Sequence, residues 1–255
     1  DSAVLWARST ATGPITFTYG TDSTFSTTDG SETANVQNPW LPVKQALSGT
    51  LNPATRYYYR VEDAAGRVGM GTFYTPALTG THGLRFGVSG DWRGDLAPYP
   101  AVGNVPMYNL DFFVAHGDTF YADYPTPAVP LTQAVTLENY RHKNSEVYSY
   151  RYGWNTLGDL RASTALLATI DDHEVTNDFA GGAPAYTDGQ NAGNPSNPMS
   201  RFGDGNELIN DTELYENGMQ AFQEYNPIRD EFYGDTGDPR TANERKLYRY
   251  QTYGD

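Results

Sequence analysis

Three apolar runs in this chain have the composition of buried strands, and carboxylates follow each of them. The runs span residues 84–88, 112–115 and 165–170. The carboxylates that come after them, in chain order, include Asp91, Asp118 and Asp172. In α/β sheets, ligands bind outside the carboxyl ends of the strands, so acids repeated there can converge on one point. Because such acids would otherwise repel one another, the pattern predicts a cation that holds them together.

Length and charge limit the classes of protein that fit. At 255 residues the chain can form one large or two small domains, and we expect two. Its formal charge of −14 argues against a nucleic-acid backbone as partner, which requires basic patches. A phosphate ester substrate would need bound cations to invert the local field. Cysteine is absent, which excludes disulfides and thiolate metal sites.

The N-terminal part has the pattern of an all-β domain. Apolar and polar residues alternate at 15–19 and again at 56–61, with turn-rich segments between them. Residues 51–61 resemble the fibronectin type III signature, in which a Leu and Pro turn precedes a Tyr-rich strand. An edge strand rich in β-forming residues is the plainer alternative. We expect a fibronectin type III-like sandwich at residues 1–78.

From residue 84 the pattern changes to buried strands separated by long segments, which predicts an α/β domain at 84–255. Spacing compatible with helices occurs at 139–160 and at 211–225, where Asp211 or Thr212 is the expected N-cap. Residues 181–210 are rich in Gly, Pro, Asn and Asp, and we expect a long loop there that acts as a lid.

Asp118 and Tyr121 point to a particular kind of metal. A turn or first helical turn would direct both side chains the same way. A phenol near a trivalent cation ionises, and phenolate suits ferric iron, whereas Ca²⁺ and Mg²⁺ prefer carboxylate and carbonyl oxygens. Asp91 and Asp172 would supply further carboxylates.

Three other side chains in these loops are candidates for the site. His173 lies beside acids whose charge should raise its pKa enough for it to protonate a leaving group. Arg93 either binds a phosphate oxygen or neutralises Asp95. Asn177 either ligates a metal, holds a metal ligand in place, or caps the loop.

The acidic runs resemble the three successive motif blocks of the metallophosphoesterase superfamily. The resemblance rests on Asp91, on the Gly-Asp-x-x-Tyr run at 117–121 and on the Asp-Asp-His-Glu-Val-Thr-Asn run at 171–177. It is strongest to the PhoD-like alkaline phosphatase and phosphodiesterase branch, in which a fibronectin-like domain precedes the catalytic one. It covers nearly the whole chain.

This resemblance implies a function and a role for each ligand. The chain would hydrolyse phosphate monoesters or diesters, small-molecule substrates, with Fe³⁺ and Ca²⁺ as cofactors. Asp118 would bridge the metals, Tyr121 would ligate iron, Asp172 would stand where the superfamily has an Asn ligand, and His173 would face the phosphoryl oxygen. Secretion or a periplasmic location is also implied.

Two departures from the family pattern affect the metal site. Some relatives place a Cys ligand after the first strand, and this chain has none. The superfamily also closes its site with histidines from later strands, yet no histidine follows His173. We therefore expect an enzyme fragment cut at both ends, with an incomplete first sandwich strand and a missing C-terminal part, and with the remainder of the protein as a second piece.

One rival from another class stays open. In it, the chain is a non-catalytic secreted structural or adhesion protein whose acidic strand-end loops bind calcium. A serine hydrolase is disfavoured, because residues 87–91 have Asp where the nucleophile turn needs Gly. No apolar run approaches the roughly 20 residues of a membrane span, and residues 1–6 lack the order of a signal peptide. Residues 203–207 lack the ligand spacing of an EF-hand.

Overall fold

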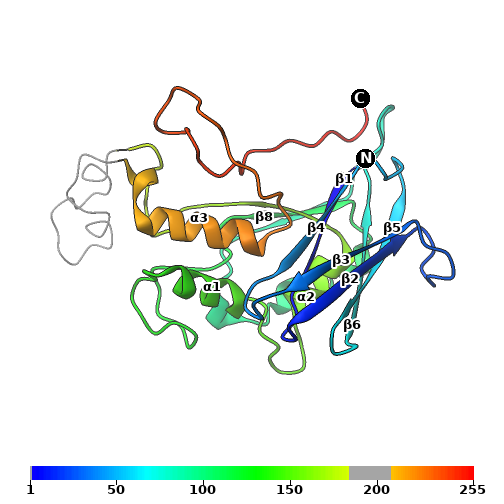
Figure 1. Ribbon diagram of the computed structural model, residues 1–255, viewed down its shortest axis with the longest axis horizontal. Helices are drawn as coiled ribbons and strands as arrows, with labels where there is room; N and C mark the ends of the chain where they lie inside the picture. Colours follow the sequence, from blue (N-terminus) through cyan, green and yellow to red (C-terminus); the bar gives the residue numbers. More distant parts are fainter. Residues whose placement is uncertain (1, 184–207) are drawn as a thin grey trace.

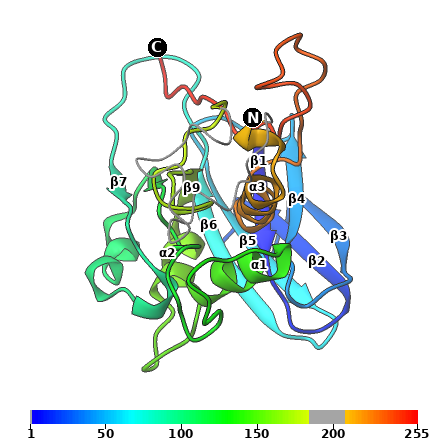
Figure 2. The same cartoon turned by 90° about the vertical axis from the view of Figure 1, so that its left-hand side faces the viewer.

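The computed structural model describes residues 2–183 and 208–255. A strand-rich part, built from the first third of the chain, lies beside a part that combines a small sheet with helices (Figures 1 and 2). Each part has its own hydrophobic cluster. Part of the expected loop at 181–210, and the segment 203–207, lie outside the described residues.

Two antiparallel sheets enclose the first cluster. One pairs β1 with β4, and the other has the order β3-β2-β5-β6. The strands are β1 (Ser2–Ala7), β2 (Gly13–Gly20), β3 (Gly30–Val36), β4 (Val43–Ser48), β5 (Arg56–Asp63) and β6 (Val68–Tyr74). Ile15 and Phe17 of β2 point inward with Leu5 of β1 and Leu47 of β4, so both sheets share one core. This alternation is the period of two that the sequence shows.

The start of β5 has the contact of a tyrosine corner. The Tyr57 hydroxyl accepts the backbone amide of Asn52 at 2.9 Å, which fixes the turn that precedes the strand. This contact agrees with the expected fibronectin type III-like character, which stays a prediction.

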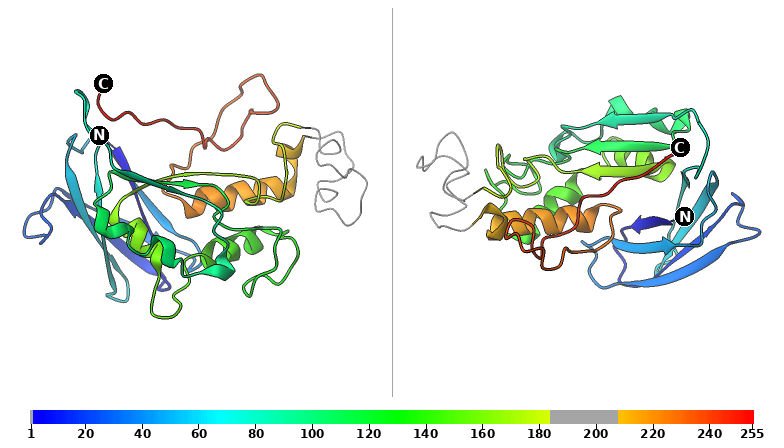
Figure 3. Two further views of the ribbon diagram at one scale, coloured as in Figure 1. Left: turned by 180° about the vertical axis from the view of Figure 1, so that it is seen from behind. Right: turned by 90° about the horizontal axis from the view of Figure 1, so that it is seen from above.

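The three predicted strands behind the acids are present and form a parallel sheet of order β7-β8-β9. They are β7 (Phe86–Ser89), β8 (Phe112–His116) and β9 (Ala165–Thr169). Between or after them lie the helices α1 (Leu137–Glu146), α2 (Thr156–Ser163) and α3 (Glu213–Tyr225), with the short 3₁₀ turns Gly94–Leu96, Pro100–Val102, Val105–Tyr108 and Ile209–Asp211. The strands therefore meet with their carboxyl ends at one edge (Figure 3).

The helices differ in detail from the expectation. The stretch 139–160 contains two helices, because Thr136 caps α1 through a capping box with Asn139, and Asn155 caps α2. Thr212, one of the two residues expected as the N-cap, caps α3. The C-terminal stretch 246–253 has no regular secondary structure, since it pairs with no strand of the three sheets.

The expectation that all three parallel strands are buried on both faces is wrong for β7. Helices α1, α2 and α3 cover one face, where Phe113 and Leu166 join the second cluster. On the other face, Phe86 is 53% and Val88 is 54% exposed, and β7 is an edge strand of its sheet. The C-terminal stretch covers a part of this face, where Tyr253 packs on Phe112. No helix within residues 2–183 and 208–255 is both long and apolar enough to cross a bilayer.

Candidate metal centre

The loops after β7, β8 and β9 are tied to one another by backbone hydrogen bonds. The amide of Trp92 donates to the carbonyl of Asp118 at 2.7 Å, and the amide of Ala122 donates to the carbonyl of His173 at 2.9 Å. The loops that carry the predicted acids therefore form one connected edge.

Their backbone adopts conformations that side chains rarely tolerate. Asp91 has φ 60° and Asp118 has φ 50°, both in the left-handed region. Gly117, with φ 71°, precedes Asp118, and a Cβ there would lie 2.5 Å from the Cβ of Asp171. Only glycine allows the two loops to approach this closely. Such conformations are often found at functional sites.

Asp118 is the centre of the cluster. It is 7% exposed, and its Oδ2 accepts the Tyr121 hydroxyl at 3.3 Å. The same hydroxyl reaches Asp91 Oδ1 at 3.3 Å. Asp118, Asp172 and His173 each offer a ligand atom, and these atoms lie within 4.8 Å of one another. The structure thus brings together five of the predicted site residues.

Burial and mutual repulsion shape the charges of the cluster. Desolvation raises the pKa of Asp118 to about 6, and the neighbouring Asp172 and Asp171 add to the rise, while His173 opposes it. Burial also raises the pKa of the Tyr121 phenol, together with the charges of Asp118 and Asp91. Without a cation, Asp118 therefore holds a proton at higher pH than an ordinary aspartate does, and the phenol stays neutral.

His173 is oriented by a residue to which the sequence assigns no role. Its Nδ1 lies 2.7 Å from Asp123 Oδ1, and its ring stacks on the Tyr121 ring with centroids 3.8 Å apart. Burial lowers the pKa of His173, but the hydrogen bond and charge of Asp123, with the other acids, raise it overall. The position of Asp123, two residues after Tyr121, was a weak signal, since several acids lie equally near in sequence.

Glu174 is a second residue that sequence reasoning left without a role. Its side chain is fully buried and accepts three backbone amides, those of Thr119 at 2.7 Å, Asp171 at 2.8 Å and Asp118 at 3.0 Å. Burial raises its pKa to about 8, although the three amides act in the opposite direction. Glu174 thus joins the loop after β8 to the loop after β9.

This chain resembles known proteins both in sequence and in fold. The model of the PhoD-like phosphatase family matches residues 88–255, well over half of the chain. The chain belongs to the PhoD-like phosphatase family. A solved structure described as "Structure of PhoD" superposes with a TM-score of 0.71 and 21% identity, over 100% of this chain and 48% of that one.

That likeness shows the fold, and this PhoD-like chain spans about half the length of the structure it matches. A Paenibacillus sp. cycloisomaltooligosaccharide glucanotransferase complexed with cycloisomaltoheptaose matches over 67% of this chain and 25% of that one. Its 11% identity and TM-score of 0.28 carry no structural argument. No curated protein matches the sequence.

Two predicted residues of this PhoD-like site lie beside the cluster rather than in it. The Asn177 amide donates to Asp178 at 2.6 Å. The Asp178 backbone amide in turn donates to Asp172, so this pair supports the loop that carries Asp172.

Arg93 pairs with Asp95 through Nε at 3.1 Å and Nη2 at 2.7 Å. Its guanidinium carbon lies 3.9 Å from the centroid of the Tyr124 ring. The structure therefore shows the neutralising contact with Asp95.

The donors of the PhoD-like cluster fit a hard cation. Carboxylates of Asp91, Asp118 and Asp172 and the phenol of Tyr121 are oxygen ligands, and His173 adds an imidazole. The raised pKa of Asp118 is the expected state of a carboxylate that lacks its counterion.

Proposed function

We propose that this protein hydrolyses phosphate monoesters or diesters with the help of cations bound by Asp91, Asp118, Tyr121 and Asp172. The observation that carries the proposal is the convergence on Asp118, whose carboxylate contacts the Tyr121 hydroxyl and lies within ligand range of Asp172 and His173. Membership of a phosphatase family favours this function over a calcium-binding scaffold.

Each side chain has a proposed role. A cation held by the acids would polarise the phosphoryl oxygen and neutralise the charge that develops on it. His173, held by Asp123 through Nδ1, presents the rest of its ring to the ester and protonates the leaving oxygen. Asp95 occupies Nε and Nη2 of Arg93, so a phosphate oxygen would be bound through Nη1.

The decisive experiment is Asp118→Asn. We expect loss of both bound metal, measured by elemental analysis, and turnover of p-nitrophenyl phosphate and bis(p-nitrophenyl) phosphate. Asp29→Asn is the matched control, because Asp29 lies in the connection between β2 and β3, far from the cluster along the chain. If the Asp118 variant keeps full turnover, Asp118 has no part in the reaction. Because the chain spans about half of the matched structure, the assay includes the full-length protein.

The metals proposed from the family resemblance are Fe³⁺ at Tyr121 and Ca²⁺ beside it. Ferric phenolate absorbs visible light, so the loaded protein should be coloured. Tyr121→Phe should abolish the visible band, whereas Tyr150→Phe, at a position 73% exposed, should leave it unchanged. A colourless native protein that contains calcium alone would remove iron from the proposal.

We also propose a domain division near residue 80, since each part has its own core. The proposed location is secreted or periplasmic, which rests on the family resemblance and on the net charge of −14.

A further inference from the structure

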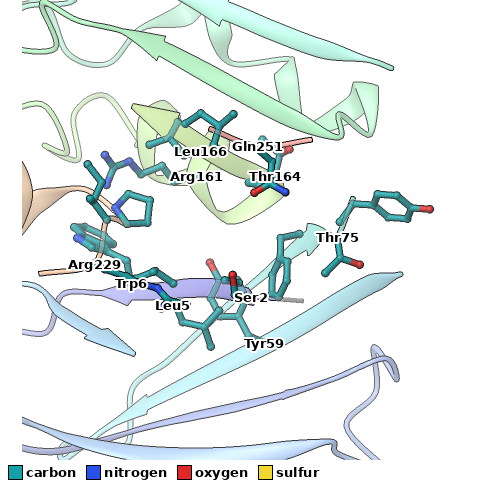
Figure 4. Close-up of a pocket in the computed structure, with 18 of the residues that line it drawn as sticks. Ser2, Leu5, Trp6, Tyr59, Thr75, Arg161, Thr164, Leu166, Arg229 and Gln251 are labelled. Atoms are coloured by element: carbon teal, nitrogen blue, oxygen red, sulfur yellow. The ribbon is translucent and has the colours of Figure 1, made fainter. Parts of the chain in front are cut away.

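A cavity of about 700 Å³ lies between the two parts of the molecule, away from the carboxylate cluster. Strands β1 and β6 form one side, and α2, β9 and the C-terminal stretch form the other (Figure 4). None of the proposed metal ligands lines it. Its volume is within the range of small-molecule binding sites.

Most of the wall is apolar. Leu5 and Phe73 of the first core face the cavity from one side, and Leu166 of the second core faces it from the other. Tyr59 adds an aromatic surface, and burial raises the pKa of its phenol, so the hydroxyl stays neutral. The body of a ligand here would have to be a hydrocarbon or an aromatic group.

Three arginines that line the cavity have no carboxylate partner within residues 2–183 and 208–255. Arg161 donates to the carbonyl of Tyr225 at 2.8 Å and to Asn226. Arg229 donates to the Ser48 hydroxyl at 2.6 Å.

The third, Arg249, donates to the carbonyls of Leu247 and Ala168. Acidic residues outnumber basic ones by 31 to 17 in this chain. Three arginines without a carboxylate partner therefore give this cavity a positive charge that is opposite to the net charge of the chain.

Two residues that line the cavity, Trp6 and Arg161, each carry a buried donor without an acceptor. Nε of Arg161 and Nε1 of Trp6 are inaccessible to solvent and make no hydrogen bond. They belong to neighbouring side chains, because the Arg161 guanidinium carbon lies 5.0 Å from the centroid of the Trp6 ring (Figure 4). Unpaired buried donors are unfavourable. Burial also lowers the pKa of Arg161 and of Arg249, and an anion would relieve this cost.

We propose that this cavity binds an amphipathic anion, with an apolar body between the two cores and a single carboxylate or phosphate-like head toward Arg161, Arg229 and Arg249. Such a ligand would bridge the two parts of the molecule at a site separate from the proposed hydrolytic centre. The apolar wall explains the body, and the three arginines without a carboxylate partner explain the head.

Isothermal titration calorimetry with submicellar ligands tests the proposal on the intact chain. Dodecanoate and dodecylphosphonate, neither of which a phosphatase can hydrolyse, should each bind saturably. The ratio of their dissociation constants tells which head is preferred. Dodecyltrimethylammonium and butyrate should bind at least about tenfold more weakly, because each lacks one of the two features. Equal binding of the cationic amphiphile would overturn the proposal, as would no saturable binding of either anion.

Two variants place the binding in the cavity. Arg229→Gln should weaken dodecanoate binding by about tenfold, whereas Arg85→Gln, at an exposed arginine outside the cavity whose guanidinium donates to the carbonyl of Tyr108, should not. Gly69→Leu should block the cavity mouth, since a Cβ there meets open space, and Gly83→Leu is the matched change outside the cavity. If both members of either pair bind equally, the ligand lies elsewhere and the inference is wrong.

Discussion

The buried carboxylate of Glu174 holds the backbone amide of Asp118 at 3.0 Å, across 56 positions of sequence. The same carboxylate accepts the amides of Thr119 and Asp171, so one side chain sets the distance between two strand-end loops. The proposed metal ligands are therefore positioned through their backbone, by a residue that is not itself a ligand.

Glu174→Gln should destabilise the protein by about 2 kcal/mol or more, because the new amide group turns a donor toward backbone donors and leaves at least one unpaired. Urea unfolding at pH 9, above the raised pKa of Glu174, followed by circular dichroism measures the change. Glu32→Gln, at an exposed position of β3, should stay within about 0.5 kcal/mol. Equal costs for the two variants would show that the three amide contacts contribute nothing.

Gly117→Ala should cost more stability than Gly66→Ala. Both glycines have positive φ, 71° and 74°, so both variants incur the strain of a left-handed residue. A Cβ at Gly66 meets nothing within 4 Å, whereas one at Gly117 meets Asp171. The difference, about 1–3 kcal/mol in the free energy of unfolding, isolates the clash between the loops. If the two variants unfold at the same urea concentration, the loops separate without cost.

Metal affinity should fall as the pH drops below about 6, because a proton on Asp118 then competes with the cation. The expected loss is about tenfold per pH unit for this one group. Equilibrium dialysis at pH 5 and pH 7 checks it, and Asp118→Asn should remove this pH dependence along with most of the affinity.

The stability of the metal-free protein should change with pH in a defined direction. The folded pKa of Asp118, about 6, lies above the ordinary value of 3.8 for an aspartate. The stabilising contribution is thus complete below pH 3.8 and is lost as the pH rises through 6. Added metal should restore stability at pH 7. If Asp118 instead makes the metal-free protein more stable as the pH rises from 3.8 to 6, the raised pKa of Asp118 is wrong.

Asp123→Asn should lower turnover by about 10- to 100-fold for an alkyl phosphate and by less for p-nitrophenyl phosphate. An alkoxide needs the proton that His173 supplies, whereas p-nitrophenolate leaves without it. Steady-state kinetics with both esters provides the internal control, and Asp159→Asn, at the first turn of α2, should change neither rate. Equal losses for both esters would mean that Asp123 acts on something other than leaving-group protonation.

The convergence of Asp91, Asp118 and Asp172 was predictable, because parallel strands place their carboxyl ends at one edge and each acid follows such a strand. The pairing of His173 with Asp123 was not predictable, because several acids lie within a few residues of His173 along the chain or in the neighbouring loop. The exposure of Phe86 was missed for a related reason: an apolar strand is recognisable by its residues, but what covers each face depends on other segments.

The sequence by itself determined which residues end the strands and which donors they carry, because strand period and turn chemistry are local properties. Tertiary structure alone decided that Glu174 is buried among amides from another loop, that Asp123 holds His173, and that unpaired arginines face a cavity between the two cores. These features depend on distances between segments far apart in the chain, which the packing of the whole molecule establishes.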